Sequence, residues 1–501
     1  RGSGTINGQT EVSGRLAPGN SPGTLTFTES VVQLPGSTLQ IDIDGTGTGE
    51  GAGNYSRVIV TGEDNTYTAA GTLEPLLRGI TGDANNDFTP EIGTNFIIVE
   101  AEGGVLGAFD ALSQPTDGLA TGSTFRVFYG ENQIMLAVAP LSYASFGQTA
   151  NARAAGRALN GLVANGEGGD LEMAIMGLND AQLANTFQQL SGEIHADVIA
   201  AGMEVRRLGR NGVSQRLAML RAGETAERAD HIDLWVEFLG RTGRIDDDTN
   251  AVGYRLQAGG IAIGADYVFM DNLRAGVGAA TVWGDVNTRG FGNGESNSTQ
   301  MFVYGSWQQE GFFVDAAVAH SWDRYETDRN VALNAGTELY TSRVRGTNWA
   351  GDVTVGMRHD VRGYSVEPSA GIRWDEANRR AVTETGAAIA RLDVDGVSSS
   401  AAEGRVGARV TRSYVTETTV ITPEIRAFWV HDFQSGKFRT ASLQGEDFQI
   451  RTPGVGRNAA LIGVGLNADV SDTVQVYADY DARLRGSETA HALSAGVRVR
   501  F

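Results

Sequence analysis

Apolar and polar residues alternate along the final part of the chain. Every second residue from 493 to 501 is apolar, ending in Phe501, and the residues between them are small, polar or basic. The segment from Val474 to Arg485 alternates in the same way, with both of its aspartates and both of its arginines on one face. Because successive side chains of a strand point to opposite sides, this period of two predicts β-strands with one apolar and one polar face.

The same alternation extends back to about Asp230 and predicts about twelve strands separated by turn residues. The strands are expected near 231–243, 253–270, 272–285, 298–309, 311–325, 345–359, 362–377, 399–415, 418–433, 458–471, 473–485 and 488–501. Short connections, at 270–272, 309–311, 359–362, 416–417 and 471–472, take turns with long ones, at 286–297, 326–344, 378–398 and 434–457. Only the short connection at 486–487 departs from this order.

Alternating strands suit either a soluble sandwich, whose polar face meets bulk water, or a membrane barrel, whose polar face lines a lumen. Strict alternation of short and long connections, with an even number of strands, is typical of bacterial outer-membrane barrels, whose short turns are periplasmic. Both ends of this barrel are therefore expected in the periplasm. Aromatic residues near strand ends would form interfacial girdles, although core positions explain them equally well: Trp235, Trp283, Trp322, Trp374 and Trp429.

The chain ahead of the barrel changes period. From about Leu171 to Leu190 apolar residues recur at helical spacing, and a second helical run follows Gly192. This second run is amphipathic and basic, and its arginines include Arg206, Arg207, Arg210 and Arg216. One interpretation is a surface helix with solvated arginines. The interpretation we favour is a helix inside the barrel lumen, facing acidic wall residues: Glu367, Glu403, Glu424, Asp479 and Asp481. Arg405 and Arg409 share the parity of Glu403 and dilute that negative wall.

Residues 1 to about 140 contain short β runs divided by Gly, Asn, Asp and Pro. Their similar size and their glycine content favour a stacked solenoid, in which each turn buries its apolar side on its neighbours. A β-sandwich is the alternative. The runs lie at 24–27, 38–43, 57–60, 95–100, 124–129 and 133–139.

Composition limits the possible functions. The chain has 67 Gly, 10 Pro and no Cys, which fits short strands and excludes both disulfides and thiolate metal sites. A formal charge of −20 argues against nucleic-acid binding, which needs a basic face. No stretch reaches the ~18 apolar residues of a membrane helix. The chain begins at Arg1 without a charged and apolar leader, so we expect a signal peptide to have been removed or to lie outside this sequence.

Several motifs carry no chemistry on close reading, and we expect no catalytic, cofactor or metal site. The GNSPG run at 19–23 has the spacing of a nucleophile elbow but lacks the following helix, and turn chemistry explains it. The segment 83–87 begins like a calcium loop, but Phe88 and Thr94 replace the residues it requires. The six histidines lack the spacing of a helical metal pair.

Four segments resemble the classical monomeric autotransporters of type V secretion. The runs at 14–27 (GRLAPGNSPGTLTF) and 95–109 (NFIIVEAEGGVLGAF) are similar to the last turns of such a passenger. The run at 189–196 (QLSGEIHA) is similar to the segment before the family's pore helix, and 497–501 (VRVRF) to its barrel terminus.

The resemblance implies a mainly β protein in three parts. Residues 1–140 would be the end of a right-handed parallel β-helix that serves as a folding platform. Residues 141–229 would be a linker with the pore helix, and 230–501 a 12-stranded antiparallel transmembrane barrel. It further implies an outer-membrane monomer that displays its N-terminal region at the cell surface, in contact with outer-membrane lipid, periplasmic chaperones and the barrel assembly machinery.

The resemblance also assigns roles to individual residues, one in barrel assembly and one in passenger cleavage. Val497, Val499 and Phe501 would form the terminus that the assembly machinery recognises, although a lipid-facing stripe by itself explains their apolarity. Some relatives cleave the passenger at a helix asparagine. Asn211, followed by Gly212, is a weak candidate for that step, and Gly212 has the simpler explanation of a helix irregularity.

The leading functional hypothesis is therefore a translocator that exports its own adhesin-like passenger. An ordinary porin is one alternative, and it gives no reason for the helix or the solenoid. A carrier for an upstream surface enzyme, such as an esterase, is the other.

Overall fold

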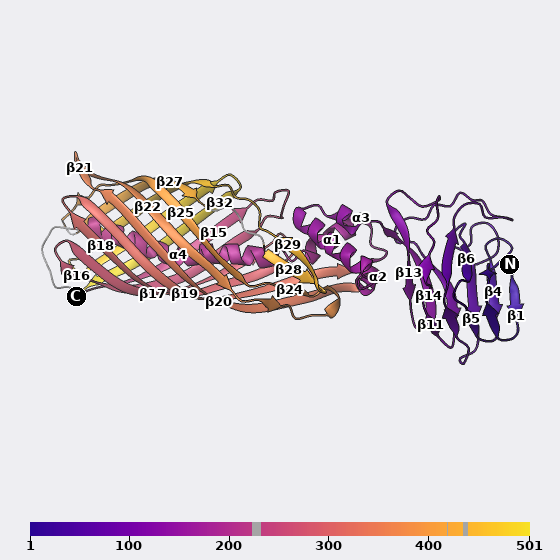
Figure 1. The fold of residues 1–501 in the computed structure, drawn as a ribbon. Helices are drawn as coiled ribbons and strands as arrows, with labels where there is room; N and C mark the ends of the chain where they lie inside the picture. Colours follow the sequence, from indigo (N-terminus) through magenta and orange to yellow (C-terminus); the bar gives the residue numbers. More distant parts are fainter. Residues whose placement is uncertain (223–231, 418, 434–438) are drawn as a thin grey trace. The chain divides into compact units, whose positions relative to one another are not determined.

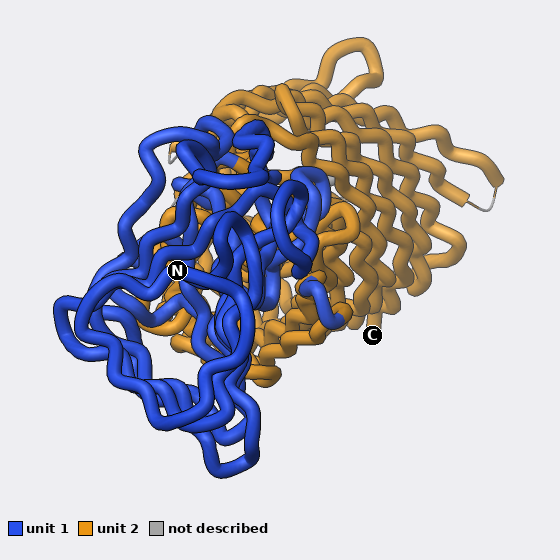
Figure 2. Tube along the Cα trace, turned by 90° about the vertical axis from the view of Figure 1, so that its right-hand side faces the viewer, with its two compact units in different colours: residues 1–145, 160–183, 333–335 blue, residues 146–159, 184–332, 336–501 orange. Residues whose placement is uncertain are grey.

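The computed structural model describes residues 1–222, 232–417, 419–433 and 439–501. The chain divides into two compact units (Figure 2). The first contains residues 1–145, 160–183 and 333–335, and the second contains residues 146–159, 184–332 and 336–501. The predicted boundary between residues 229 and 230 lies outside the described residues.

The first unit is built mainly from short parallel strands. Every third strand along the chain pairs in parallel, so that three strands complete one turn and successive turns form three sheets. One sheet contains β1 (Gly4–Ile6), β4 (Thr24–Phe27), β7 (Arg57–Val60) and β10 (Asn95–Ala101). The second contains β2 (Thr10–Val12), β5 (Val31–Gln33), β8 (Tyr67–Ala69) and β11 (Val105–Gly107), and the third contains β3 (Arg15–Leu16), β6 (Thr38–Asp42), β9 (Thr72–Leu76) and β12 (Ala111–Leu112).

Apolar residues stack along the inside of this solenoid. Phe27 pairs with Val60, and Val60 with Ala101, so the same inward position stays apolar over three turns. All three side chains are buried, as are Leu39 and Leu73 in the third sheet. One turn cannot bury its apolar side alone, and stacking gives each turn a covered face. The predicted solenoid is therefore confirmed over the sandwich alternative.

An antiparallel pair closes the end of the solenoid. β13 (Ser123–Tyr129) and β14 (Gln133–Pro140) form a hairpin, and β14 continues the first sheet by pairing antiparallel with β10. Phe125 of this hairpin is fully buried, and its ring lies 6.3 Å from that of Phe96 in edge-to-face contact. The hairpin covers apolar surface that a further parallel turn would otherwise bury.

Helices follow the hairpin. They are η1 (Tyr143–Phe146), α1 (Ala150–Ala164), α2 (Gly169–Ile175), α3 (Asp180–Leu190) and α4 (Ile194–Ala222). The helical region thus begins earlier than the predicted Leu171, because the alanine-rich α1 has strong helix propensity but few large apolar residues to reveal a period. No helix among the described residues is long and apolar enough to cross a membrane.

The second unit is a closed antiparallel barrel of twelve long strands (Figure 1). In chain order they are β15 (Ile232–Ile245), β16 (Arg255–Met270), β17 (Leu273–Asn287), β18 (Asn293–Gln309), β19 (Phe312–Leu333), β20 (Gly336–Met357), β22 (Tyr364–Arg379), β25 (Val397–Thr411), β27 (Val420–Asp432), β30 (Asn458–Asp469), β31 (Val474–Arg485) and β32 (Glu488–Arg500). β15 pairs with β32, which closes the wall. The short strands β21 (His359–Val361) and β26 (Tyr414–Val415) extend it at the short-turn end.

The strand positions agree with the alternating pattern, but two predicted long connections are wrong. The segment 326–344 is a continuation of β19 and β20, which run to a tight turn at 334–335, and β18 starts at Asn293 instead of near 298. These strands continue beyond the apolar band, where the outward face is polar, as at Asp328 and Asn330, and buried apolar residues such as Val331 and Leu333 lie on the inward face. The apolar-outward alternation therefore fades in the sequence before the strand ends.

Two aromatic belts mark the membrane on the outside of the barrel. Phe312 and Trp322 both point outward on β19, ten residues apart. At about 3.3 Å per residue and a tilt of about 40°, this separation spans about 25 Å, the height of an outer-membrane apolar band. Trp283, Trp322, Trp374 and Trp429 are exposed as predicted, and Trp349 joins them.

Trp235 is not part of a belt, which corrects the prediction. It is 3% exposed and faces the lumen, where its indole Nε1 donates a hydrogen bond to the Tyr304 hydroxyl at 2.7 Å. Its parity explains this position, because Trp235 shares a strand face with Asp233 and Glu237.

A small sheet lies at the long-loop end of the barrel. It joins β23 (Val382–Thr383) and β24 (Leu392–Val394), which flank η2 (Ala388–Ala390), to β28 (Arg439–Leu443) and β29 (Glu446–Ile450). These strands belong to two predicted long loops, 378–398 and 434–457. We call this element the outer sheet.

Candidate functional site: the helix-filled barrel lumen

Helix α4 runs inside the barrel (Figure 1). It packs chiefly on β17 and β18 and touches β15, β16 and β22 more lightly, so it lies against one side of the wall. Val198, Val205 and Leu208 of the helix are buried together with Val282 and Phe302 of the wall. The lumen of this barrel is therefore a packed core on one side.

The direction of α4 follows from its wall contacts. At its first turn, Asp197 accepts a hydrogen bond from Thr288 at 2.7 Å, in the loop between β17 and β18 at the long-loop end. Near its last turn, Arg216 donates to Asp266 at 2.8 Å, close to the short-turn end of β16. The backbone amide of Phe501 also lies at that end, donating to the Ile232 carbonyl at 3.0 Å. The chain thus enters the lumen at the long-loop end and passes to the end where β15 begins.

The four predicted arginines of α4 are buried and paired with carboxylates of the wall. Arg206 lies 2.8 Å from Asp323, and Arg216 lies 2.8 Å from Asp266 and 3.0 Å from Asp233. Arg207 and Arg210 both contact Asp375. Each ion pair has side chains at most 7% exposed, so water screens these charges much less than it screens surface pairs.

Three glycines let α4 approach the wall closely. A Cβ on Gly202 would lie 2.7 Å from the Tyr325 ring, one on Gly209 would lie 2.6 Å from the Gln300 amide nitrogen, and one on Gly212 would lie 2.5 Å from a Glu237 carboxylate oxygen. At Gly202 the close neighbour is a ring, which cannot easily move aside, whereas at Gly209 and Gly212 the end of a flexible side chain would have to move. Gly212 therefore has a packing role that the sequence analysis did not assign to it.

Comparison with known proteins places this architecture in a family. A model of the autotransporter β-domain matches residues 234–481. Among solved structures, the translocator domain of the autotransporter NalP from Neisseria meningitidis matches with a TM-score of 0.50 and 16% identity, covering 62% of this chain and 100% of that one. The barrel is an autotransporter β-domain. Its place is accordingly the bacterial outer membrane, which makes the long-loop end extracellular and the short-turn end periplasmic.

Curated relatives are longer proteins. Two extracellular serine protease sequences from Serratia marcescens are 25% identical over 339 residues, which is 64% of this chain and 31% of that protein, and 22% identical over 552 residues, which is 100% of this chain and 52% of that protein. Outer membrane protein B of Rickettsia rickettsii is 27% identical over 268 residues, which is 50% of this chain and 16% of that protein. The chain thus spans about half, or less, of the length of these relatives.

The predicted acidic wall of the autotransporter lumen is present, but most of its members have other partners. Of the five predicted carboxylates, Glu403 lies 3.4 Å from Arg207 of the helix. Glu424, Asp479 and Asp481 instead surround Arg426, a residue of the wall itself, at 2.6, 2.7 and 2.8 Å. Glu367 is buried in the same lumen. Because α4 lies to one side, its arginines reach carboxylates on nearer strands.

The main partners of the helix arginines were missed in the sequence: Asp233, Asp266, Asp323, Asp352 and Asp375. Each lies at a lumen-facing position of its strand, so strand parity identifies them as wall residues. Parity cannot tell which wall residue faces which turn of the helix, since that depends on how strands and helix are placed around the lumen.

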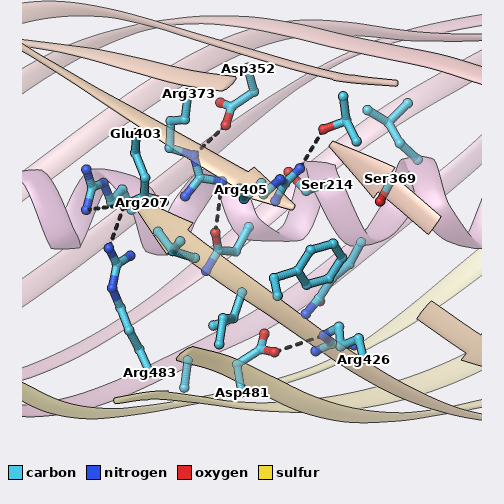
Figure 3. A pocket seen from close by; sticks show the side chains of 18 of the residues that line it. Arg207, Ser214, Asp352, Ser369, Arg373, Glu403, Arg405, Arg426, Asp481 and Arg483 are labelled. Atoms are coloured by element: carbon cyan, nitrogen blue, oxygen red, sulfur yellow. Dashed lines mark hydrogen bonds and ion pairs between the residues drawn. The ribbon is translucent and has the colours of Figure 1, made fainter. Parts of the chain in front are cut away.

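Free space remains in the lumen between one face of α4 and the facing wall (Figure 3). It is a cavity of about 100 Å³ with both charges on its walls. Arg373 pairs with Asp352 there, while Arg405 donates to the Thr354 hydroxyl at 2.7 Å and lies over the Phe428 ring. Charged and polar side chains of the helix and the wall thus line this cavity.

A buried polar network fixes the extracellular mouth of the barrel. Glu384, in the loop between β23 and η2, pairs with Arg329 of β19 and lies 2.8 Å from His195 of α4. Nη1 of Arg329 donates to the Gln189 carbonyl at 3.1 Å, and Nη2, which also contacts Glu384, donates to the Ala390 carbonyl at 2.7 Å. We call His195, Arg329 and Glu384 the mouth network. It joins the start of α4, the longest hairpin and the outer sheet.

Two carboxylates at this mouth have shifted pKa values of opposite sign. Burial alone would raise the pKa of Glu384, but the Arg329 charge and the bond to His195 outweigh it and lower the pKa to about 2. Burial raises the pKa of Glu193, which accepts hydrogen bonds from Asn151 and Gln188 but has no cationic partner among its neighbours in the described chain. Glu384 is therefore a charged anchor, whereas Glu193 favours its neutral form.

The remaining predicted residues lie on the outer face of the barrel, in α4 and in the solenoid. Val497 and Phe501 point outward and are exposed, and Val499 is half-buried on the same face. Asn211 lies within α4, with Arg373 3.4 Å from its side-chain oxygen. In the solenoid, Asp44 accepts backbone hydrogen bonds from Asn85 and Asn86 at 2.8 and 2.6 Å, which holds the loop that resembles a calcium site. Within the described ranges, no group of three or more histidines and carboxylates is placed to bind a metal.

Proposed function

We propose that this autotransporter chain exports its own N-terminal region through the barrel. Within this proposal residues 1–140 form the folding platform, 141–229 the linker with the pore helix, and 230–501 the translocator, and the chain itself carries out no bond chemistry. The observation that supports export is the direction of α4, whose first residue, Ile194, lies at the extracellular mouth. The residues before Ile194 therefore leave the lumen on the outside of the cell.

Protease shaving of intact cells tests export. The expected result is cleavage within residues 1–140 while the barrel strands survive, because only the exported part meets the protease. Permeabilised cells provide the control, since they expose both sides. Protection of residues 1–140 in intact cells would contradict export, provided that the barrel is inserted.

An ordinary porin is the alternative. It requires an open lumen, whereas α4 fills one side of this lumen and pairs four arginines with the wall. Deletion of residues 203–219 tests the plugging role of the helix: single-channel conductance should rise severalfold as the lumen opens. An unchanged conductance would remove the idea that α4 closes the pore.

The platform role rests on the end of the solenoid. β13 and β14 cover the last parallel turn with a hairpin whose Phe125 is fully buried. A capped end gives the preceding turns a finished surface on which to stack. We therefore propose that the solenoid folds from this hairpin towards the N-terminus as the chain emerges.

We consider two proposals for the nature of the passenger. An adhesin fits the display of a solenoid at the cell surface. A surface enzyme fits the Serratia marcescens relatives, whose printed name is extracellular serine protease and one of which matches along all of this chain. A protease is therefore the enzyme alternative with specific support, ahead of an esterase. A protease assay on the natural full-length protein distinguishes the two proposals, since only a protease passenger should cleave a substrate protein.

We also propose roles for single residues in barrel assembly and in passenger cleavage. Outer-membrane insertion by the barrel assembly machinery, with periplasmic chaperones acting before it, would use Val497, Val499 and Phe501. Replacing Phe501 with Ser should therefore reduce the folded fraction of a monomeric barrel.

Cleavage at Asn211 is the weaker proposal, since Gly212 is explained by its contact with Glu237. Intact mass of the surface-exposed material tests it, and a full-length chain excludes that cleavage.

A further inference from the structure

Three arginines stand side by side on the outer face of the barrel, directly above the extracellular tryptophan belt. They are Arg324 of β19, Arg345 of β20 and Arg380, which follows β22. β20 pairs with β22 through Gly346 and Arg379, and the Arg380 amide donates to the Arg345 carbonyl at 3.4 Å. We call these residues the arginine row. All three are exposed.

The arginine row borders a groove of about 580 Å³ on the outside of the wall. Its lining combines the three arginines with Trp322, Thr347 and Asn378. The groove is thus apolar on the membrane side, where the Trp322 indole lies, and basic on the side facing the cell exterior.

Among the described residues, only Arg324 of the arginine row has an ion-pair partner. Glu326, a neighbouring carboxylate, is occupied by Arg324 at 2.6 Å and Arg343 at 2.9 Å, and Glu376 accepts a hydrogen bond from Asn378. Among the described residues no ion pair reaches Arg345 or Arg380. Like charges at neighbouring cross-strand positions destabilise a sheet unless an anion lies between them. Arg345 and Arg380 thus place two positive charges side by side in a chain whose formal charge is −20.

The height of the row indicates what the anion is. Arg324 follows Trp322 by two residues on the same face of β19, a rise of about 7 Å along the strand. Belt tryptophans sit at the level of lipid headgroups, so the guanidinium groups lie at the headgroup or just outside it. Guanidinium groups bind phosphate through paired hydrogen bonds.

We propose that the arginine row binds the phosphate group of an anionic lipid in the outer leaflet, with the acyl chains of that lipid lying on Trp322 and the strands below. The barrel then carries a lipid-specific contact on one segment of its circumference, β19, β20 and β22. This contact is independent of the export function, because no residue of the row faces the lumen.

Full-length chain reconstituted in lipid nanodiscs tests this site. The bilayer is phosphatidylcholine with a small fraction of bis-phosphorylated lipid A, or of the same lipid with both phosphates removed. Native mass spectrometry counts the lipid A molecules that stay bound when the protein is released from the disc. We expect retention of the phosphorylated lipid to exceed that of the dephosphorylated lipid about tenfold, and R345Q/R380Q to abolish this preference.

A matched variant controls for the loss of charge. R358Q/R412Q removes two arginines near the periplasmic end, outside the groove, and should keep the preference. Heat-modifiable migration in gels verifies that each variant is a folded barrel. Equal retention of both lipids by the natural chain, or an undiminished preference in R345Q/R380Q, would overturn the proposal. Full displacement of the lipid by inorganic phosphate at millimolar concentration would also overturn it, since the site would then bind free phosphate instead of a lipid.

Discussion

At the scale of single residues, buried ion pairs decide how the helix is held. Arg206 and Asp323 are each 1% exposed, and Asp323 also accepts a hydrogen bond from the Tyr325 hydroxyl. Pairs of this kind need not stabilise the fold more than well-packed apolar residues would. They do fix the register of the helix against the wall, because an unpaired charge in this packed lumen is costly.

Replacement of Arg206 by Ala should therefore destabilise the barrel by about 3–5 kcal/mol, since Asp323 keeps its charge without a cation. The measurement is the folded-to-unfolded transition in denaturant, followed by heat-modifiable migration. Arg244→Ala is the control: Arg244 pairs with Asp246 at 2.8 Å, but both side chains are more than half exposed, and its loss should cost at most about 1 kcal/mol. A cost for Arg206→Ala no larger than for Arg244→Ala would contradict the prediction.

The lack of a side chain at Gly202 also decides how closely α4 packs against the wall. Its missing side chain lets α4 approach Tyr325, whose hydroxyl is held by Arg206 at 3.0 Å and cannot easily move. Gly202→Val should push α4 off the wall and raise single-channel conductance above that of the natural chain. Ser214→Val is the matched control, since Ser214 lines the lumen cavity. Equal conductance of the two variants would show that close packing at Gly202 does not hold the plug.

At the scale of elements, the mouth network ties three parts of the extracellular end together. Glu384 is the common member, since it contacts Arg329 and His195 and also accepts the Leu392 amide of the outer sheet at 2.9 Å. The pKa of Glu384 falls from its ordinary value of 4.5 to about 2. A carboxyl whose pKa is lowered in the folded state stabilises that state above its unfolded pKa, and this stabilisation is lost as the pH falls through the folded pKa.

The outer sheet should therefore loosen between about pH 4.5 and pH 2, by an amount on the order of 3 kcal/mol. Hydrogen exchange at the Leu392 amide, corrected for the intrinsic rate, measures this opening. In Glu384→Gln the amide should exchange faster at neutral pH and show little further change on acidification. Protection of Leu392 that persists unchanged in the natural chain down to pH 2 would contradict the assigned role of Glu384.

At the scale of the whole molecule, the chain consists of two units with separate cores. The solenoid core contains Phe27, Val60 and Phe125, while the barrel core gathers α4 and the wall strands. These two apolar clusters share no residue. Each unit therefore has an apolar core of its own, as expected of parts that can fold and unfold separately.

Phe125→Ala should lower the unfolding temperature of the solenoid and leave that of the barrel unchanged, because the cavity it creates lies in one core only. The expected cost is about 3–5 kcal/mol in the free energy of unfolding of the solenoid. Calorimetry of the full chain in detergent separates the two transitions. The exposed Tyr129, on the same hairpin, provides the control as Tyr129→Ala. A shift of both transitions by Phe125→Ala would mean that the units are thermodynamically coupled.

The sequence by itself determined the classes of structure and most strand positions. A strand has a period of two and a helix a period near 3.6, so alternation predicted the barrel strands and their periplasmic termini, and the change of period predicted the basic helix with Arg206, Arg207, Arg210 and Arg216. Repeated short runs predicted the solenoid. These are local properties, encoded by residues that are neighbours in the chain.

Only the tertiary structure decided which charges meet. The position of α4 against β17 and β18 gave its arginines Asp323, Asp375 and Asp266 as partners and left Asp479 and Asp481 to Arg426. It also turned Trp235 towards the lumen, gave Gly212 a packing role and aligned Arg324, Arg345 and Arg380 on neighbouring strands. Each of these outcomes depends on which strand stands beside which and at what register. That is a property of the closed barrel and not of any segment within it.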